Sequence, residues 1–202
     1  MNQSDLFLSG EANEWFKRNR EHLGKRDPVG NLLNLLPLVR PRHILEVGCA
    51  NGWRLLKLKE RYKCRVSGIE PSYDACLEAA ASGLDDVAND TFGRVQWLGG
   101  TFDMIIFAFC LYVTSPSDWL RIVAEADRLL SDGGYLVIHD FARPKEAFKK
   151  VYEHRPELWS YHVDFAKMWL SHPYYEEYDG ADFDDERVTI LRKDQTNIKV
   201  EQ

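Results

Sequence analysis

The chain has 202 residues, of which 45% are apolar and 29% are charged, and this composition is typical of one globular domain with a packed core. Its formal net charge of -6 argues against a general binder of nucleic acids or anionic membranes, because such a protein needs a basic surface. The sequence has no apolar run of about 18 residues and no basic-then-apolar leader, so we expect a cytoplasmic protein without membrane contact.

The elements predicted from the sequence alternate between helix and strand, which indicates a mostly parallel sheet covered by helices on both faces. Helices are predicted over residues 11–24, 29–39, 51–62, 72–82 and 116–131. Strands are predicted over residues 43–48, 65–71, 94–98, 102–113, 135–141 and 185–194. The acidic segment 176–186 is predicted to be a solvated loop.

The four cysteines are far apart and form no C-x-x-C pair; they are Cys49, Cys64, Cys76 and Cys110. This spacing predicts reduced thiols and neither a disulfide framework nor a metal site.

The most informative segment is HILEVGCANGW, residues 43–53. A buried strand leads into a turn containing Gly48 and Gly52, where a ligand can approach the backbone because glycine has no Cβ. The next strand ends in Glu70, and an acid in that position can accept hydrogen bonds from ribose hydroxyls. The two features together predict a cofactor of the adenosine type.

The choice of cofactor depends on three residues of the first turn and strand. A dinucleotide site would have G-x-G-x-x-G, but Ala50 and Trp53 stand in place of its second and third glycines. Glu46 would repel a pyrophosphate, and it suits the ammonium and sulfonium of S-adenosylmethionine. A nicotinamide-dependent reductase is the alternative, although the sequence shows no evident Tyr-x-x-x-Lys pair. A non-catalytic module that binds a partner through its aromatic tail is a further alternative.

Four segments in the order LEVGCANG, GIEPS, TFDMIIFAFCLYV and LLSDGGYLVIHDF resemble the motifs of the Rossmann-like, S-adenosylmethionine-dependent methyltransferases. The resemblance covers roughly residues 40–142. It implies an α/β fold with a mostly parallel seven-stranded sheet, helices on both faces and an antiparallel last strand. It also implies one domain, in which residues 1–40 form a helical lid, 41–142 bind the cofactor, and the aromatic-rich residues 143–202 border the substrate.

The same resemblance implies which residues hold S-adenosylmethionine and its product S-adenosylhomocysteine. Those expected beside the methionine and ribose are Glu46, Gly48, Cys49, Gly52 and Glu70. Those expected beside the adenine are Pro71, Asp90, Thr91 and Phe92, and those expected near the sulfonium are Phe109 and Cys110.

A hydroxyl acceptor often needs a general base in addition to alignment with the methyl group. The strand 135–141 ends near His139 and Asp140, and His154 follows in the aromatic tail. We predict that Asp140 acts together with His154 or His139. The competing interpretation is that these histidines are hydrogen-bonded packing residues.

Several features bear on the acceptor. The segment after the fourth strand lacks the Asp/Asn-Pro-Pro-Tyr/Phe motif of amino-base methyltransferases, and Cys110 does not follow a proline as in cytosine C5 enzymes. The basic residues Lys17, Arg18, Arg20, Lys25 and Arg26 could contact a phosphate or form a solvated helix face. We therefore expect a small-molecule acceptor and no nucleic acid.

The N-terminal segment and the tail also resemble a small bacterial subgroup of methyltransferases associated with surface-glycan or specialised-metabolite clusters. That resemblance implies that the N-terminal helix is a lid, with Trp15 and Asn19 at the cofactor. It favours a hydroxyl of a sugar, a sugar nucleotide or a related phosphorylated metabolite as acceptor. We expect the protein to be a monomer or a homodimer.

Overall fold

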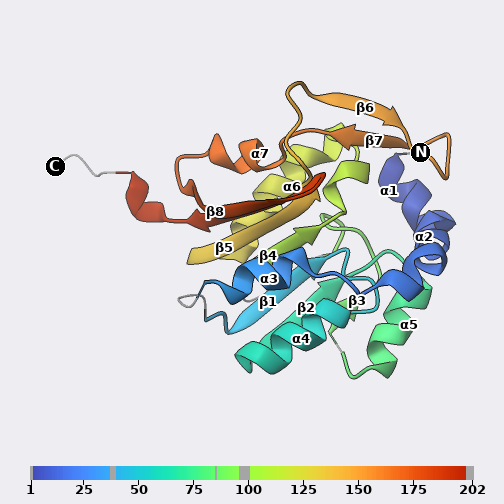
Figure 1. Ribbon diagram of the computed structural model, residues 1–202, viewed down its shortest axis with the longest axis horizontal. Helices are drawn as coiled ribbons and strands as arrows, with labels where there is room; N and C mark the ends of the chain where they lie inside the picture. Colours follow the sequence, from blue (N-terminus) through green and yellow to red (C-terminus); the bar gives the residue numbers. More distant parts are fainter. Residues whose placement is uncertain (1, 37–39, 85, 96–100, 199–202) are drawn as a thin grey trace.

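A computed structural model describes residues 2–36, 40–84, 86–95 and 101–198, and it shows one seven-stranded sheet with the order β3-β2-β1-β4-β5-β9-β8 (Figure 1). The strands are β1 (His43–Val47), β2 (Arg65–Ile69), β3 (Val87–Ala88), β4 (Phe102–Ala108), β5 (Leu130–Phe141), β8 (Tyr175–Phe183) and β9 (Glu186–Lys193). Strands β1 to β5 are parallel, β9 is antiparallel to β5, and β8 is antiparallel to β9. The predicted fold class is confirmed.

Two apolar cores lie on opposite faces of this sheet. One face is covered by α3 (Pro28–Asn34), α4 (Trp53–Tyr62) and α5 (Tyr73–Ala81), and the other by α6 (Pro116–Leu129) and α7 (Ala166–Leu170). In α4, Leu55 and Leu58 are buried because their spacing of three residues places both on one helix face. The alternation of apolar helices with parallel strands therefore gives the layers that the sequence predicted.

The N-terminal segment crosses one end of the sheet (Figure 1). It consists of α1 (Gln3–Leu6), a π-helical turn η1 (Phe7–Glu11), α2 (Ala12–Asn19) and a short 3-10 turn η2 (Arg20–His22). The other short elements are η3 (Leu111–Val113), η4 (Gln195–Asn197) and a separate hairpin of β6 (Phe148–Val151) and β7 (Trp159–His162). No helix among the described residues is long and apolar enough to cross a membrane.

The strand register aligns the carboxyl ends of the parallel strands at that same end of the sheet. Val47 is paired with Ile69 and with Phe107, and Ala108 is paired with His139. Strand β9 begins there because it is antiparallel, so Glu186 lies opposite the last residue of β5. Loops that are far apart in the sequence thereby converge on one edge.

The structure corrects four expected elements. Most of the acidic segment 176–186 is strand β8 rather than a loop, since polar and charged side chains are tolerated on the edge strand of a sheet. The third strand is β3, whereas residues 94 and 95 form no strand and 96–98 lie outside the described residues. The predicted strand 102–113 ends at Ala108, because Phe109 has φ +49° and leaves the extended conformation. Helix α3 ends at Asn34, and residues 37–39 are likewise outside the described part.

Candidate active site

A cavity of about 490 Å³ lies over the carboxyl ends of β1, β2, β4 and β5, and the N-terminal segment forms its opposite wall. The predicted site residues that line it are Trp15, Asn19, Glu46, Gly48, Cys49, Glu70, Pro71, Asp90, Thr91, Phe92, Phe109, Cys110 and His139. Three predicted site residues are not among the lining residues: Gly52, Asp140 and His154. The cavity lies where open α/β sheets bind ligands.

The turn after β1 approaches the loop after β4 more closely than a side chain would allow. Gly48 has φ +72°, and a Cβ added to it would lie 2.9 Å from the Cβ of Cys110. Gly52 also has φ +72°, but a Cβ there would overlap Leu84, so this glycine permits packing beneath the turn instead of facing the cavity. The two glycines of the motif thus have separate structural roles.

Glu70 joins the turn after β1 to the turn after β2. Its Oε2 accepts a hydrogen bond from the Ala50 amide at 2.8 Å, and its Oε1 accepts one from the Ser72 amide at 2.7 Å. Burial raises the pKa of Glu70 to about 7, although the two amides oppose that rise. Because a carboxylate has about four lone-pair sites, it can still accept hydrogen bonds from a ligand in the cavity.

Glu46 is 1% exposed and makes a buried ion pair with Arg54, a cavity residue that the sequence reasoning did not identify. The same guanidinium donates to Asp27 through Nε at 3.1 Å. Burial raises the pKa of Glu46, and the charge of Arg54 opposes this. Glu46 Oε2 has no hydrogen-bond partner among the described residues, so the carboxylate can accept from a donor that enters the cavity.

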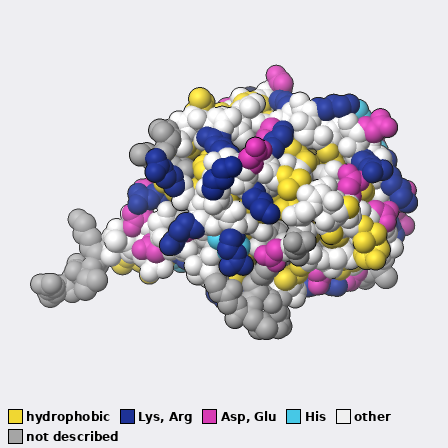
Figure 2. Space-filling model, turned by 90° about the horizontal axis from the view of Figure 1, so that it is seen from below, with side chains coloured by type: hydrophobic (Ala, Val, Ile, Leu, Met, Phe, Trp, Pro, Cys, Tyr) yellow, Lys and Arg dark blue, Asp and Glu magenta, His cyan; other side chains and the backbone are white. Residues whose placement is uncertain are grey.

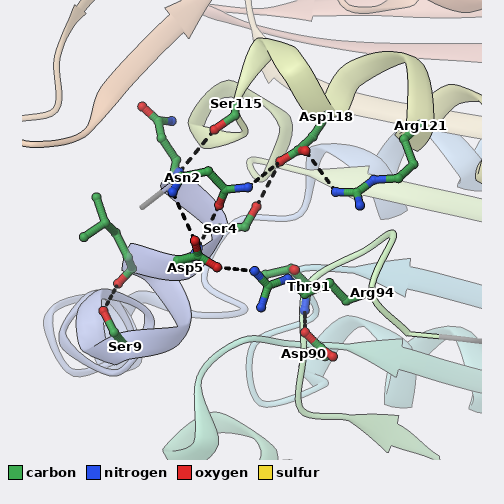
Figure 3. Close-up of polar contacts among 12 residues, drawn as sticks. Asn2, Ser4, Asp5, Ser9, Asp90, Thr91, Arg94, Ser115, Asp118 and Arg121 are labelled. Atoms are coloured by element: carbon green, nitrogen blue, oxygen red, sulfur yellow. Dashed lines mark hydrogen bonds and ion pairs between the residues drawn. The ribbon is translucent and has the colours of Figure 1, made fainter.

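The turn after β3 closes the far end of the cavity and is tied to α1 (Figure 3). Asp90 Oδ1 accepts a hydrogen bond from the Thr91 amide at 2.7 Å. The ring of Phe92 packs edge-on against Phe107, with 5.3 Å between ring centroids. Arg94 forms an ion pair with Asp5 of α1. The turn after β3 therefore places an aromatic ring and a hydrogen-bonded carboxylate at this end of the cavity.

The N-terminal segment is held by specific polar contacts. Gln3 is 7% exposed, and its Nε2 donates to the carbonyls of Val113 at 2.6 Å and Trp159 at 3.1 Å. Its Oε1 accepts from the Trp159 amide at 2.7 Å. Figure 3 shows Asn2 and Ser4 directed at Asp118 of α6. The segment is consequently docked over the cavity, and Trp15 and Asn19 of α2 line it.

The three predicted catalytic residues are not brought together. Successive side chains of a strand point to opposite faces, so His139 lines the cavity while Asp140 lies on the other face. Burial raises the pKa of Asp140 to about 7, and its Oδ2 has no partner among the described residues. His154 is exposed, lies in the turn between β6 and β7, and contacts the ring of Tyr152.

His139 instead contacts Glu186, which the sequence reasoning also missed. The distance from His139 Nε2 to Glu186 Oε2 is 3.0 Å, and Glu186 Oε1 accepts from Arg26 Nη1 at 3.1 Å. All three residues line the cavity. No local pattern predicts this pair, because the antiparallel pairing of β9 with β5 brings together residues 47 positions apart.

Most of the basic N-terminal residues are neutralised by neighbouring acids. Their ion pairs are Lys17 with Glu14 at 3.0 Å, Arg18 with Glu11 at 2.6 Å, Arg20 with Glu78 at 2.7 Å, and Arg26 with Glu186 at 3.1 Å. Of the five, only Arg26 lines the cavity.

Comparison with known proteins identifies the family. A family model described as a methyltransferase domain matches residues 16–183. The tRNA N(3)-methylcytidine methyltransferase trm140 of Schizosaccharomyces pombe is 27% identical over 155 residues, which are 69% of this chain and 48% of that protein. The (+)-O-methylkolavelool synthase of Herpetosiphon aurantiacus is 26% identical over 125 residues, which are 57% of this chain and 44% of that protein. The chain thus spans about half the length of the curated relatives that it matches.

Solved structures show the same fold. The Burkholderia thailandensis 1,6-didemethyltoxoflavin-N1-methyltransferase, with bound S-adenosylhomocysteine, superposes with a TM-score of 0.76 at 16% identity, covering 96% of this chain and 87% of that one. The N-methyltransferase NodS of Bradyrhizobium japonicum gives 0.63 at 20% identity, covering 89% and 97%. The family match removes the reductase alternative. The chain belongs to the family described as a methyltransferase domain.

Proposed function

We propose that this chain transfers a methyl group from S-adenosylmethionine to a hydroxyl of a small molecule bound in the same cavity. The observation that carries the proposal is the extent of that cavity, which runs from Asp90 and Glu70 to His139 and Glu186. The first pair suits an adenosine, and the second pair can receive a proton. A donor and an acceptor can therefore lie in contact, which is the main requirement for an in-line displacement.

The residues at the β1–β3 side fit the cofactor. Glu70 would accept hydrogen bonds from the ribose hydroxyls, and the unpartnered Glu46 Oε2 would accept from the ammonium. Gly48 leaves the space that a Cβ would fill beside Cys110. The remaining proposed cofactor contacts are Trp15, Asn19, Cys49, Pro71, Asp90, Thr91, Phe92 and Phe109. The bound cofactor supplies an electrophilic methyl carbon.

The acceptor side of the cavity is mainly aromatic and apolar, with one cluster of charge. Phe7, Phe109 and Tyr112 line it, together with the half-exposed cation Arg26. This lining suits a small acceptor with one polar group near His139. A sugar, a sugar nucleotide or a related phosphorylated metabolite is the class favoured by the resemblance to the bacterial subgroup, and Arg26 could face a phosphate.

An RNA acceptor is the second candidate, favoured by the match to the tRNA methyltransferase and by a basic cleft. This cleft of about 760 Å³ is lined by Arg40, Arg42, Arg61, Lys63 and Arg65. Figure 2 shows Lys and Arg side chains gathered on the face seen from below. The cleft lies at the amino ends of β1 and β2, opposite the cavity, so a small-molecule acceptor remains the leading proposal.

The test of the cofactor proposal is ligand-dependent unfolding. S-adenosylhomocysteine at about 100 times its Kd should add about 2.7 kcal/mol to the free energy of unfolding, and NAD should add nothing. Glu70→Ala should abolish the increase, whereas Glu60→Ala at an exposed position of α4 should keep it. Stabilisation that survives in Glu70→Ala would refute the ribose assignment.

The acceptor is then tested with labelled S-adenosylmethionine. Label should pass to hydroxyl-bearing sugars, sugar nucleotides or other small metabolites, and not to total RNA. Label found only in RNA would replace the small-molecule proposal by the second candidate.

A further inference from the structure

His139 is one of the most enclosed polar side chains of the cavity. Its side chain is 5% exposed, and the ring of Phe109 packs edge-on against it with 4.7 Å between centroids. Its Nε2 lies 3.0 Å from Glu186 Oε2. A carboxylate can only accept a hydrogen bond, so this contact assigns the ring proton to Nε2 and leaves the lone pair on Nδ1.

Nδ1 of His139 is buried and has no hydrogen-bond partner among the described residues. A buried ring nitrogen without a partner costs free energy, because its hydration is lost without replacement. His139 lines the cavity, so a hydroxyl donor bound there could supply the missing partner once the atoms that cover Nδ1 shift slightly. His139 Nδ1 is thus a proton acceptor with no partner in the part of the chain that the structure describes.

Glu186 uses its second oxygen for a different residue. Oε1 accepts from Arg26 Nη1 at 3.1 Å, and Arg26 Nη2 lies 3.3 Å from both the Phe183 carbonyl and Asp184 Oδ2. Arg26 follows the N-terminal segment that covers the cavity, whereas Glu186 begins β9. One carboxylate therefore connects His139 to the chain segment that forms the cavity wall.

We propose that Glu186 and Arg26 are positioning residues that hold His139 as the proton acceptor for a hydroxyl-bearing substrate. This inference rests on the proposed methyl transfer. As the acceptor oxygen bonds to the methyl carbon, the electron pair of the carbon–sulfur bond stays on sulfur and the hydroxyl proton passes to His139 Nδ1. The products are the methyl ether, S-adenosylhomocysteine and an imidazolium, which the Glu186 carboxylate stabilises.

The two positioning residues act on His139 in opposite senses. Burial is the largest influence and lowers the pKa of His139, the hydrogen bond to Glu186 raises it, and the charges of Arg54 and Arg26 lower it. Removing Glu186 should therefore lower that pKa, whereas removing Arg26 should raise it. A role limited to packing would not produce shifts of opposite sign.

The experiment is an NMR titration of ¹⁵N-histidine-labelled protein, with the His139 resonances assigned from His139→Asn. The variants are Glu186→Gln and Arg26→Gln. The controls are Glu177→Gln and Arg143→Gln, which break an ion pair between β8 and the segment that follows β5. We expect a lower pKa of His139 in the first variant, a higher one in the second and unchanged values in both controls. Shifts of the same sign, or none, would overturn the role of Glu186 and Arg26.

Kinetics with an acceptor from the substrate panel test the chemical step. His139→Asn should lower kcat by about 10²-fold or more, while its Kd for S-adenosylhomocysteine stays within about twofold of the wild-type value. The acidic limb of the kcat profile should move to lower pH in Glu186→Gln, and Glu186→Asp should restore part of its position. An unchanged kcat in His139→Asn with intact cofactor binding would refute the role of His139 as proton acceptor and leave the proposed methyl transfer standing. If the wild-type protein itself does not bind S-adenosylhomocysteine, the proposed function is refuted instead.

Discussion

The amide of Ala50 donates a hydrogen bond to Glu70 Oε2 at 2.8 Å, so the acid that follows β2 is bound to the turn that follows β1. Ala50 has φ +50°, a left-handed conformation that is costly for a residue with a Cβ. The contact with Glu70 helps to hold this conformation. Cofactor affinity should consequently depend on the charge state of Glu70.

Cofactor binding should strengthen as the pH rises. Burial raises the pKa of Glu70 from 4.5 to about 7, so below pH 7 the carboxyl of the free protein is mostly protonated. A ligand whose hydroxyls donate to the carboxylate must displace that proton. The affinity for S-adenosylhomocysteine should therefore increase by up to about tenfold per pH unit below 7 and level off above it.

Calorimetry at several pH values, in buffers with different ionisation enthalpies, measures this dependence and the accompanying proton release. Glu70→Gln is the matched control, because it keeps the shape of the side chain and cannot titrate. An equally steep pH dependence in Glu70→Gln would assign the effect to another group.

Gly48→Ala should destabilise the protein by about 1–3 kcal/mol and weaken cofactor binding. The substitution adds two costs, since Gly48 has φ +72° and its new Cβ would lie 2.9 Å from the Cβ of Cys110. Gly83→Ala is the control for the first cost alone, because Gly83 has φ +89° and an added Cβ meets nothing within 4 Å. Urea unfolding should give a larger loss for Gly48→Ala, and equal losses would mean that the contact with Cys110 relaxes freely.

Gln3→Ala should release the N-terminal segment from the cavity. The substitution leaves the Trp159 amide and the Val113 carbonyl without their side-chain partner, and this should cost about 1–3 kcal/mol. Hydrogen exchange measured by mass spectrometry should become faster over residues 2–24. Ser9→Ala, at an exposed position of the same segment, should leave the exchange unchanged (Figure 3). Uniform acceleration across the sheet would instead indicate global destabilisation.

The stability of Asp140→Asn relative to wild type should be greater at high pH than at low pH. Burial raises the folded-state pKa of Asp140 from 3.8 to about 7, so the native state keeps a proton that the unfolded chain releases. The wild-type free energy of unfolding should fall as the pH rises from about 4 to 7, by about 1.4 kcal/mol per unit of pKa difference. The asparagine variant lacks this contribution.

Urea unfolding at pH 5 and pH 8 measures the difference in free energy of unfolding between wild type and Asp140→Asn. The contributions of other titrating groups cancel in this difference. Asp185→Asn, at the exposed turn between β8 and β9, should show no such difference between the two pH values. A constant offset between wild type and Asp140→Asn would show that Asp140 keeps an ordinary pKa.

The sequence determined the features that depend on local pattern. Apolar runs flanked by glycine and proline located β1, β2 and the carboxyl end of β5 within two residues, because burial on both faces requires continuous apolar strands. Strand β5 begins five residues earlier than predicted, at Leu130. The glycine turn and Glu70 predicted the cofactor edge, since they follow two consecutive parallel strands. The hairpin β8–β9 was harder to predict, because an edge strand rich in acidic residues has the composition of a loop.

Tertiary structure decided which residues form the proposed acceptor side of the cavity. The sequence placed His139 and Asp140 next to each other, but strand alternation sends only His139 into the cavity. Its partner Glu186 comes from a strand that pairs in the opposite direction, and Arg26 comes from the turn between η2 and α3. Arg54 likewise reaches Glu46 across a turn. Most of the proposed cofactor contacts thus lie between Glu46 and Phe92 in the sequence. The proposed acceptor side is instead assembled from segments whose proximity depends on sheet register and on the docking of the N-terminal segment.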